Sequence, residues 1–278
     1  MNNKNNQNLN IVALIPARSG SKGIINKNIK LYKGIPLIAH SINIAKESKY
    51  IQEIYVSTDS KEYAELAIKY GAIAPFLRPS ELSDDLSSDY ECFNHFLEWF
   101  RNNNYDGVFR KLQGSPVPDI IIHLRPTYPI RLVEVLDKSI ELFLENYDKY
   151  DSLRSVVLLQ KTPYKMYYID KDYNNLIPFI KDSGFLEGSP ESGDARIRSE
   201  EGANNFDKNN RFKEPFNQAR QNFPDTYLHN GCIDIVKSSV IINQKLLSGK
   251  KIFPFIMDEN ETNDIDDIND FLRSEKTV

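Results

Sequence analysis

The chain has 278 residues, which is enough for one large α/β domain with a smaller inserted lobe. Hydrophobic residues make up 40% of the chain and charged residues 27%, with a formal net charge of -4, as in an ordinary soluble globular protein. The sequence has neither the basic runs of a nucleic-acid-binding protein nor the long apolar run of a membrane span, so we expect no nucleic-acid partner and no membrane partner.

The first residues and the cysteines indicate the compartment. Residues 1–9 are polar and rich in Asn, without the apolar core of a secretory signal, so we expect them to be a disordered leader. Cys92 and Cys232 lack the spacing of metal ligands and lie in patterns typical of a helix and of a strand. We interpret both as reduced core residues of a cytoplasmic protein rather than as a disulfide.

Strand-like apolar runs alternate with segments of helical periodicity over the first 160 residues. The predicted strands are 10–15, 53–57, 119–124 and 155–159, and the predicted helices are 35–46, 61–70, 88–100 and 132–144. Repeated strand–helix–strand units favour an α/β, Rossmann-like fold with a mostly parallel sheet and helices on both faces. Such sheets bind ligands beyond the carboxyl ends of their strands.

The periodic pattern is lost between about residues 182 and 217, where Gly, Asn and charged residues dominate. We expect a long, mobile loop here that could serve as a lid. The pattern returns with strands at 231–236 and 251–256 and helices at 239–247 and 265–272. The sequence therefore predicts one domain from residues 10–150 and 226–278, with an inserted lobe at 151–225.

The segment Ala17 to Asn28, ARSGSKGIINKN, directly follows the first predicted strand. Its two glycines and small serines allow backbone N–H groups to approach an anion, and Arg18 and Lys22 add positive charge. This is the chemistry of a triphosphate cradle, although the spacing matches neither a Walker loop nor a Gly-x-Gly-x-x-Gly motif. A solvated turn that is basic by chance is the alternative.

Hydroxyl-rich segments precede two of the predicted helices, at 56–60 (VSTDS) and 78–89. Their Ser, Thr and Asp side chains could cap those helices, and those of 78–89 could also hold a nucleotide together with the backbone amides. A third segment, His123 to Arg131, carries two arginines around a proline-stiffened turn. That pairing favours a role of Arg125 and Arg131 in facing an anion.

Near the C-terminus, Asp264 and Asp266 are two residues apart. In an extended stretch both carboxylates can converge on Mg²⁺, which takes one or two carboxylates together with phosphate oxygens. An acidic helix start, favoured by the helix dipole, explains the same residues equally well.

In this order, the segments resemble the acylneuraminate cytidylyltransferase family, the CMP-sialic acid synthetases, with CMP-Kdo synthetases as more distant relatives. The matching stretches are IPARSGSKGIINKN, IYVSTDS, LRPSELSDDLSSD, HLRPTYPIR, HNGCIDI and NDIDDINDF, and they extend over nearly the whole chain. The resemblance implies transfer of CMP from CTP to a nonulosonic, sialic-acid-like sugar with release of pyrophosphate and with Mg²⁺ as cofactor. It also implies that the small lobe mediates a homodimer.

The resemblance gives the segments their roles. It implies that Arg18 and Lys22 meet the triphosphate and that Asp264 and Asp266 hold Mg²⁺, so these four are the candidate catalytic residues. The candidate nucleotide-binding residues, from the cradle and the 78–89 segment, are Ala17, Ser19, Gly20, Ser21, Asn28, Arg78, Ser87 and Ser88. The candidate residues for the sugar acid are Arg125, Thr127, Arg220, Gln221 and Asn230.

Two positions depart from the family pattern. Arg125 stands where sialic acid synthetases carry Gln, and Leu228-His229-Asn230-Gly231 replaces an Arg-Pro-Asn-Gly motif. We expect an anionic acceptor whose carboxylate is bound by Arg125 and Arg220, because a guanidinium can donate two parallel hydrogen bonds to a carboxylate. The alternative places Arg220 on the surface and pairs Arg125 with an acidic side chain.

Several functional alternatives stay open. The chain could use another nucleoside triphosphate or a phosphorylated acceptor, or it could be a non-catalytic nucleotide-binding subunit. A dehydrogenase has a similar fold, but the first strand lacks the glycine motif of that class. His123 and His229 are candidate general bases, and a metal-bound water or direct attack would serve as well.

Overall fold

A computed structural model describes residues 9–21, 23–103, 117–172, 174–180, 215–217, 219–258, 265 and 269–271. The predicted leader (apart from Leu9), most of the predicted 182–217 loop, and Lys22, Asp264 and Asp266 lie outside the described residues. The chain divides into a large unit, Met1–Val157 with His229–Val278, and a small unit, Leu158–Leu228.

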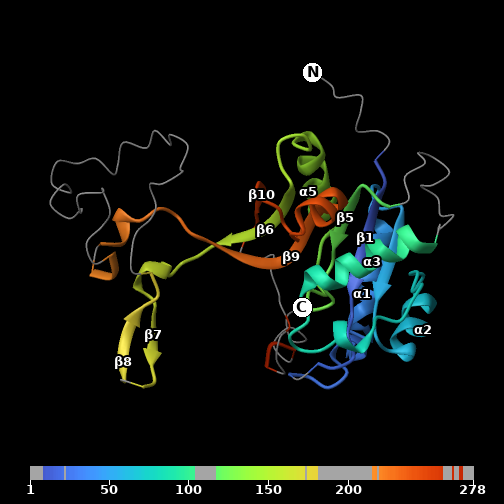
Figure 1. Cartoon of the computed structure of the whole chain (residues 1–278), viewed down its shortest axis with the longest axis horizontal. Helices are drawn as coiled ribbons and strands as arrows, with labels where there is room; N and C mark the ends of the chain where they lie inside the picture. The colour runs from blue at the N-terminus through green and yellow to red at the C-terminus, as the bar shows by residue number, and fades with distance from the viewer. Residues whose placement is uncertain are drawn as a thin grey trace. The chain divides into compact units, whose positions relative to one another are not determined.

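The large unit is built on a six-stranded sheet with the strand order β10-β6-β9-β5-β1-β4 (Figure 1). The strands are β1 (Ile11–Pro16), β4 (Glu53–Ser57), β5 (Ile120–His123), β6 (Ser152–Leu158), β9 (Tyr227–Lys237) and β10 (Ile252–Ile256). β1 pairs in parallel with β4 and β5, and β10 pairs in parallel with β6, whereas β9 runs antiparallel to β5. The predicted mostly parallel α/β sheet is therefore confirmed.

Helices cover both faces of this sheet because its central strands are apolar on both sides. On β1, Ala13 and Ile15 belong to one core cluster, while Val12 and Leu14 belong to a second. The first cluster includes side chains of α1 (Leu37–Glu47), α2 (Lys61–Lys69) and α5 (Val133–Glu145). The second is filled by α3 (Asp89–Asn103), including buried Cys92.

Three predicted elements differ from the structure for identifiable reasons. The helix predicted from residue 35 begins at Leu37, because β2 (Leu31–Tyr32) and β3 (Ile35–Pro36) form a hairpin. Its turn residues Lys33 and Gly34 have φ of 48° and 85°, as a two-residue hairpin of this type requires. The helix predicted at 239–247 is only a short π-helical turn, Val240–Gln244, because Lys245 adopts a φ of 55° and ends it. The third, the strand predicted at 155–159, extends over Ser152–Leu158 and belongs to the large sheet rather than to an inserted lobe.

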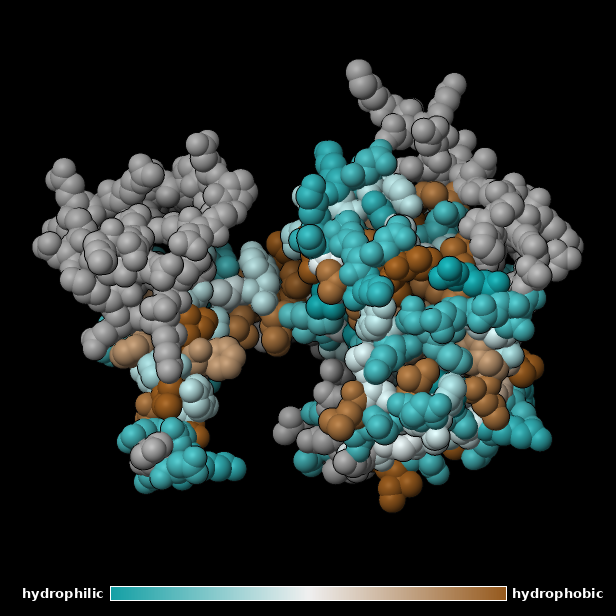
Figure 2. Space-filling model, in the orientation of Figure 1, coloured by the Kyte–Doolittle hydropathy of each residue, from teal (hydrophilic) through white to brown (hydrophobic). Residues whose placement is uncertain are grey.

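The small unit has its own hairpin, β7 (Tyr167–Asp170) with β8 (Asn175–Pro178). Short 3₁₀ turns at Pro163–Lys165, Pro215–Asn217 and Arg220–Asn222 complete its described part. The rings of Tyr164 and Phe223 stack at 4.7 Å between centroids. Figure 2 shows apolar surface on this unit. The exposed large apolar side chains of the hairpin and of the residue after it include Tyr168, Ile169, Leu176 and Phe179.

Two further properties concern the surface of the described chain. β10 is an edge strand of the large sheet and carries Pro254 at its centre, opposite Arg154 on β6. Within the described residues, no helix combines the length and apolar character needed to cross a membrane.

Candidate active site

A cleft of about 410 Å³ opens at the carboxyl ends of β1 and β5, as expected for a parallel sheet. Eight of the residues predicted from the sequence lie in its wall: Arg18, Ser21, Asn28, Arg78, Ser87, Ser88, Arg125 and Thr127. The acidic residues Asp84, Asp85 and Asp89 also line it. Segments that are more than 100 residues apart in the sequence therefore form one site.

The loop after β1 is tied to the end of β4 by several hydrogen bonds. The backbone N–H of Ala17 donates to the Ser57 carbonyl at 2.9 Å. The N–H and hydroxyl of Ser19 both donate to the Asp59 carboxylate, at 2.8 and 2.7 Å. Asn28 closes the loop by donating its amide to the Arg18 carbonyl at 2.9 Å. The described part of the predicted cradle is thus held in shape by the protein's own hydrogen bonds.

Two residues of the 56–60 segment have different structural roles. Ser60 caps α2 by accepting a hydrogen bond from the Tyr63 N–H at 3.4 Å, as the capping alternative predicts. Asp59, which the sequence offered only as another cap, instead anchors the cradle through Ser19. The signal available in the sequence was an acidic residue directly after a strand that neighbours β1.

Arg18 reaches an acidic turn that lines the same cleft. Its guanidinium forms an ion pair with Asp85 at 2.9 Å and donates to the carbonyl of Asp84. Asp84 is fixed in turn by the Ser87 hydroxyl at 2.9 Å, and this hydrogen bond lowers the pKa of the Asp84 carboxyl. A triphosphate would have to replace the Asp85 carboxylate and the Asp84 carbonyl to bind Arg18.

The capping role considered for the 78–89 segment is present in the structure, whereas its role in holding a nucleotide stays a prediction. The N–H and hydroxyl of Ser88 donate to the Glu91 carboxylate at 2.7 and 3.0 Å, a reciprocal cap at the start of α3. Arg78 is 7% exposed, and its Nε has no hydrogen-bond partner among the described residues. An orphaned guanidinium N–H in the wall of a cleft is suited to a ligand oxygen.

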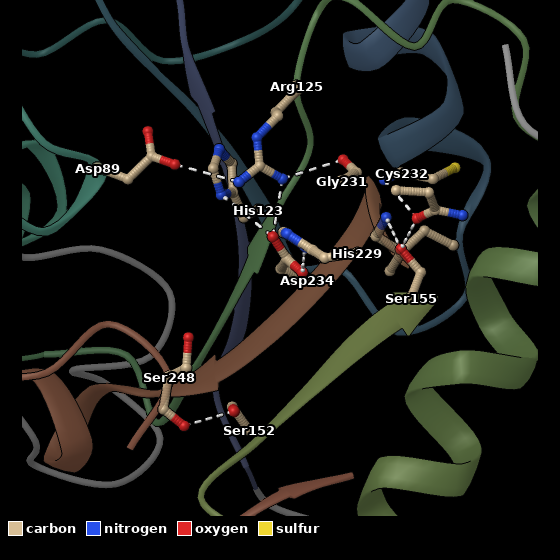
Figure 3. Close-up of polar contacts among 12 residues, drawn as sticks. Asp89, His123, Arg125, Ser152, Ser155, His229, Gly231, Cys232, Asp234 and Ser248 are labelled. Atoms are coloured by element: carbon tan, nitrogen blue, oxygen red, sulfur yellow. Dashed lines mark hydrogen bonds and ion pairs between the residues drawn. The ribbon is translucent and has the colours of Figure 1, made fainter. Parts of the chain in front are cut away.

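Arg125 lies between two carboxylates at the other end of the cleft (Figure 3). Its Nη1 donates to Asp234 at 2.7 Å and to the Gly231 carbonyl at 3.0 Å, and its Nη2 donates to Asp89 at 3.1 Å. This is the pairing with acidic side chains that the sequence left open as the alternative. Recognition of a substrate carboxylate by Arg125 stays a prediction, which would require exchange of one of these partners.

Two histidines surround the same carboxylate in Figure 3. His229 places Nε2 2.8 Å from Asp234, and buried His123 places Nδ1 3.8 Å from it. Burial would raise the pKa of Asp234, but the hydrogen bond from His229 and the charge of Arg125 hold it well below its usual range. Asp234, which the sequence did not single out, is thus the charged centre of this network.

Arg131 has a structural role, in contrast to the anion-facing role predicted for both arginines of its segment. Its guanidinium is buried and donates to the carbonyls of Cys232, Tyr128 and Arg125 at 2.7–2.8 Å, and to the Ser41 hydroxyl at 3.0 Å. These bonds fix the turn after β5 from inside. Each of the three guanidinium nitrogens therefore donates to the protein itself.

The remaining predicted acceptor residues are not part of the cleft wall described here. The Asn230 side-chain oxygen accepts from the Ser155 hydroxyl at 2.5 Å and from the Cys232 N–H at 3.1 Å, which ties β9 to β6. Arg220 and Gln221 are exposed on a 3₁₀ turn of the small unit. Contact of these three residues with a sugar acid stays a prediction.

The segment expected to hold a metal is represented by Ile265. This residue is fully buried among Ile24, Tyr32, Leu37 and Phe271. Its N–H donates to the Thr127 carbonyl at 2.9 Å, and its carbonyl accepts from Lys27 Nζ at 3.1 Å. Because Thr127 and Lys27 line the cleft, the backbone of Ile265 is anchored to two residues of the cleft wall.

Burial of His123 predicts a specific pH dependence of stability. Burial and then the charge of Arg125 lower the pKa of His123 to about 3, so the folded chain keeps it neutral while the unfolded chain takes up a proton near pH 6.5. The free energy of unfolding should therefore fall on acidification below pH 6.5, by about 1.4 kcal/mol per pH unit from this residue. In urea unfolding at pH 5.0–7.5, His123→Gln should flatten this fall, whereas Arg101→Ala should retain it. An unchanged slope in His123→Gln would contradict the assignment.

Gly231 allows the close approach of β9 to Arg125. Its φ is 71°, and a Cβ at this position would lie 3.2 Å from Arg125 Nη1. Gly231→Ala should lower the free energy of unfolding by about 1–2 kcal/mol, because an L-residue is strained in the left-handed region. Gly20→Ala is the matched control, since its Cβ would meet nothing within 4 Å. Equal denaturation midpoints for the two variants would show that Gly231 is not required.

Comparison with known proteins shows similarity to cytidylyltransferases. A sequence profile described as "Cytidylyltransferase" matches residues 12–167. Over 48% of the chain, the sequence is 40% identical to "CMP-N,N'-diacetyllegionaminic acid synthase" of Legionella pneumophila, and over 94% it is 30% identical to "N-acylneuraminate cytidylyltransferase" of Escherichia coli O18:K1:H7. The matches span 53% and 50% of those two proteins, about half their length.

A solved structure supports the fold. CMP:2-keto-3-deoxy-manno-octonic acid synthetase, in complex with CTP, superimposes with a TM-score of 0.60 at 14% identity, over 96% of this chain and 97% of that one. At this level of identity the likeness shows the Rossmann-like fold, and the sequence relatives carry the assignment to a family.

Proposed function

The chain belongs to the acylneuraminate cytidylyltransferase family, and from this premise we propose that it transfers CMP from CTP to the anomeric hydroxyl of a nonulosonic acid. Pyrophosphate is the second product. The observation that carries the proposal is the single cleft that joins the tied loop after β1 to the Arg125 turn after β5. The loop after β1 would offer backbone and cationic contacts to the phosphates of CTP. The Arg125 turn after β5 would face the acceptor sugar.

The chain's own residues would act mainly by positioning and by electrostatics, as in other phosphoryl and nucleotidyl transfers. Arg18 would exchange Asp85 for a phosphate oxygen, and Lys22, four residues beyond it, would add a second charge to the same loop. Arg78, with its orphaned Nε, would donate to the nucleotide from the cleft wall. Thr127 and Arg125 would face the acceptor.

We propose that Asp264 and Asp266 hold a Mg²⁺ ion at the edge of the cleft. The fit rests on the buried Ile265 between them, whose backbone is fixed to Thr127 and Lys27, and on the preference of Mg²⁺ for carboxylate oxygens. When bound, the ion would neutralise part of the negative charge of the phosphates.

A homodimer formed through the small unit is also part of the proposal. The hairpin residues Ile169 and Leu176, and Phe179 directly after the hairpin, are 62–68% solvent-exposed. A cluster of large apolar side chains on a surface is usually covered by a partner. A second copy of the chain would cover them. Analytical ultracentrifugation of Ile169→Lys and of the wild-type chain tests this, because a monomeric wild type would contradict it.

The nucleotide and the acceptor can be tested together by a pyrophosphate-release screen. Each of CTP, UTP, GTP and ATP with Mg²⁺ would be paired with N-acylneuraminate, a legionaminic acid, a 3-deoxy-octulosonic acid and sugar phosphates. We expect release with CTP and a nonulosonic acid only. Release with a sugar phosphate would move the chain to the alternative acceptor class, and no release with any pair would favour a nucleotide-binding subunit.

Thermal unfolding with each nucleotide gives an independent measure of base selectivity. At 100 times its Kd a ligand stabilises the folded chain by about 2.7 kcal/mol. Mg·CTP should therefore raise the melting temperature more than the other three nucleotides at equal concentration. A larger shift with UTP or GTP would overturn the choice of CTP and leave the cleft as a nucleotide site.

A further inference from the structure

His229 and Asp234 form a hydrogen-bonded pair on β9 that a regular strand could not make. Side chains five residues apart on a strand normally point to opposite faces, because successive residues alternate. Gly231 lies between them with a φ of 71° and interrupts this alternation, as a left-handed glycine does in a β-bulge. The two side chains consequently meet at 2.8 Å (Figure 3).

The hydrogen-bond geometry determines which nitrogen of His229 is available. Nε2 faces the Asp234 carboxylate and so carries the proton in the neutral ring, leaving the lone pair on Nδ1. Among the described residues, Nδ1 has no hydrogen-bond partner, and the side chain is 32% exposed. The ring is therefore oriented on one side and accessible on the other.

Asp234 connects this ring to the cleft. Its second oxygen accepts from Arg125 at 2.7 Å, and Arg125 lines the cleft beside Thr127. Asp234 stays ionised because the hydrogen bond from His229 and the charge of Arg125 outweigh its burial and lower its pKa. A carboxylate that is ionised throughout the working pH range can orient an imidazole and stabilise the imidazolium that forms on it.

Resting on the proposed function, we infer that His229 is the general base of the reaction, with Asp234 as its orienting partner. Nδ1 takes the proton from the anomeric hydroxyl of the acceptor as that oxygen forms its bond to the α-phosphorus of CTP. The bond from the α-phosphorus to the bridging oxygen breaks, and pyrophosphate leaves with that electron pair. The imidazolium, still donating from Nε2 to Asp234, then releases the Nδ1 proton to solvent.

The other histidine near Asp234, His123, is less suited than His229 to act as the general base. His123 lines the cleft, but it is only 1% exposed and neither of its ring nitrogens has a hydrogen-bond partner among the described residues. Burial keeps its pKa far below neutrality, so it is a weak proton acceptor. His229 combines an exposed lone pair with a fixed carboxylate, which is the arrangement that general-base catalysis requires.

The decisive variant is His229→Gln, because the Gln side-chain amide can replace Nε2 as the donor to Asp234 but cannot accept a proton. Pyrophosphate release from CTP and the acceptor used by the wild type would be measured with Mg²⁺. General-base loss should lower kcat by roughly 100- to 10,000-fold, with the KM for acceptor and the Kd for CTP changed less than about threefold. His95→Gln, on α3 against Phe76, is the matched control and should retain wild-type kcat.

Rescue separates chemistry from structure. In His229→Gly, added imidazole should restore part of the lost turnover, which a residue that only positions Asp234 would not allow. Wild-type kcat in His229→Gln, or no rescue of His229→Gly, overturns the inference while leaving the proposed function intact. Absence of pyrophosphate release by the wild-type chain with every pair overturns the proposed function, and this inference with it.

Discussion

Asp266→Asn should abolish turnover while the protein remains folded. If Asp264 and Asp266 share a Mg²⁺ ion, replacing one carboxylate by a neutral amide removes charge stabilisation of several kcal/mol from the transition state. A loss of about 4 kcal/mol corresponds to roughly a thousandfold lower kcat. The measurement is pyrophosphate release at increasing Mg²⁺, with circular dichroism to verify folding.

The neighbouring carboxylate supplies the control. If this stretch is extended, Asp267 would point away from the side shared by Asp264 and Asp266, so Asp267→Asn should keep most of the activity. If these aspartates only begin a helix, Asp266→Asn should instead cost about 0.5–2 kcal/mol of stability and leave kcat intact. Near-normal kcat at saturating Mg²⁺ would reject the metal site.

Arg18→Ala should cause the second large loss, in kcat/KM for CTP. The residue is held by the cradle and presents a guanidinium to the cleft, where charge develops on the phosphoryl oxygens. Removing one such preorganised donor costs about 10²- to 10³-fold in related electrostatic sites. Arg18→Lys keeps the charge but not the planar fork, and it should recover only part of the rate.

The competing ion pair offers a second readout for Arg18. Asp85→Asn removes the carboxylate that pairs with the Arg18 guanidinium at 2.9 Å. If Arg18 must leave Asp85 to bind phosphate, CTP should bind more tightly to Asp85→Asn, measured by calorimetry. Arg101 lies on the exposed end of α3, so Arg101→Ala should change neither kcat/KM for CTP nor the Kd for CTP. Weaker CTP binding by Asp85→Asn would show that the acidic turn itself contacts the nucleotide.

The sequence was sufficient to predict most of the fold. Apolar runs such as IVALIP and IIIH are buried on both faces, so they could only be central strands. The extra hairpin before α1 depended on the left-handed turn at Lys33-Gly34, which the helical periodicity of the following residues concealed. The order of the strands, and the antiparallel direction of β9, depend on long-range pairing that local patterns do not encode.

For the candidate site, the sequence predicted which residues line the cleft better than it predicted which side chains those residues contact. The cradle after β1 and the hydroxyls before α3 lie in one cleft, as the carboxyl-end rule predicts. Asp59, Asp85 and Asp234 were not given their roles, because each contacts a cleft or cradle residue at least 40 positions away, namely Ser19, Arg18 and Arg125. Arg131 was assigned to an anion, since the sequence alone does not tell whether a guanidinium faces solvent or backbone carbonyls.

The proline at the centre of β10 limits how copies of the chain can associate. An edge strand usually offers free N–H and C=O groups to a further strand, which leads to continuous intermolecular sheets. Pro254 has no N–H and therefore interrupts that row at its middle. Pairing of two large units through β10 is thus disfavoured, and the same residue protects a concentrated solution of the protein against sheet-to-sheet aggregation along this edge.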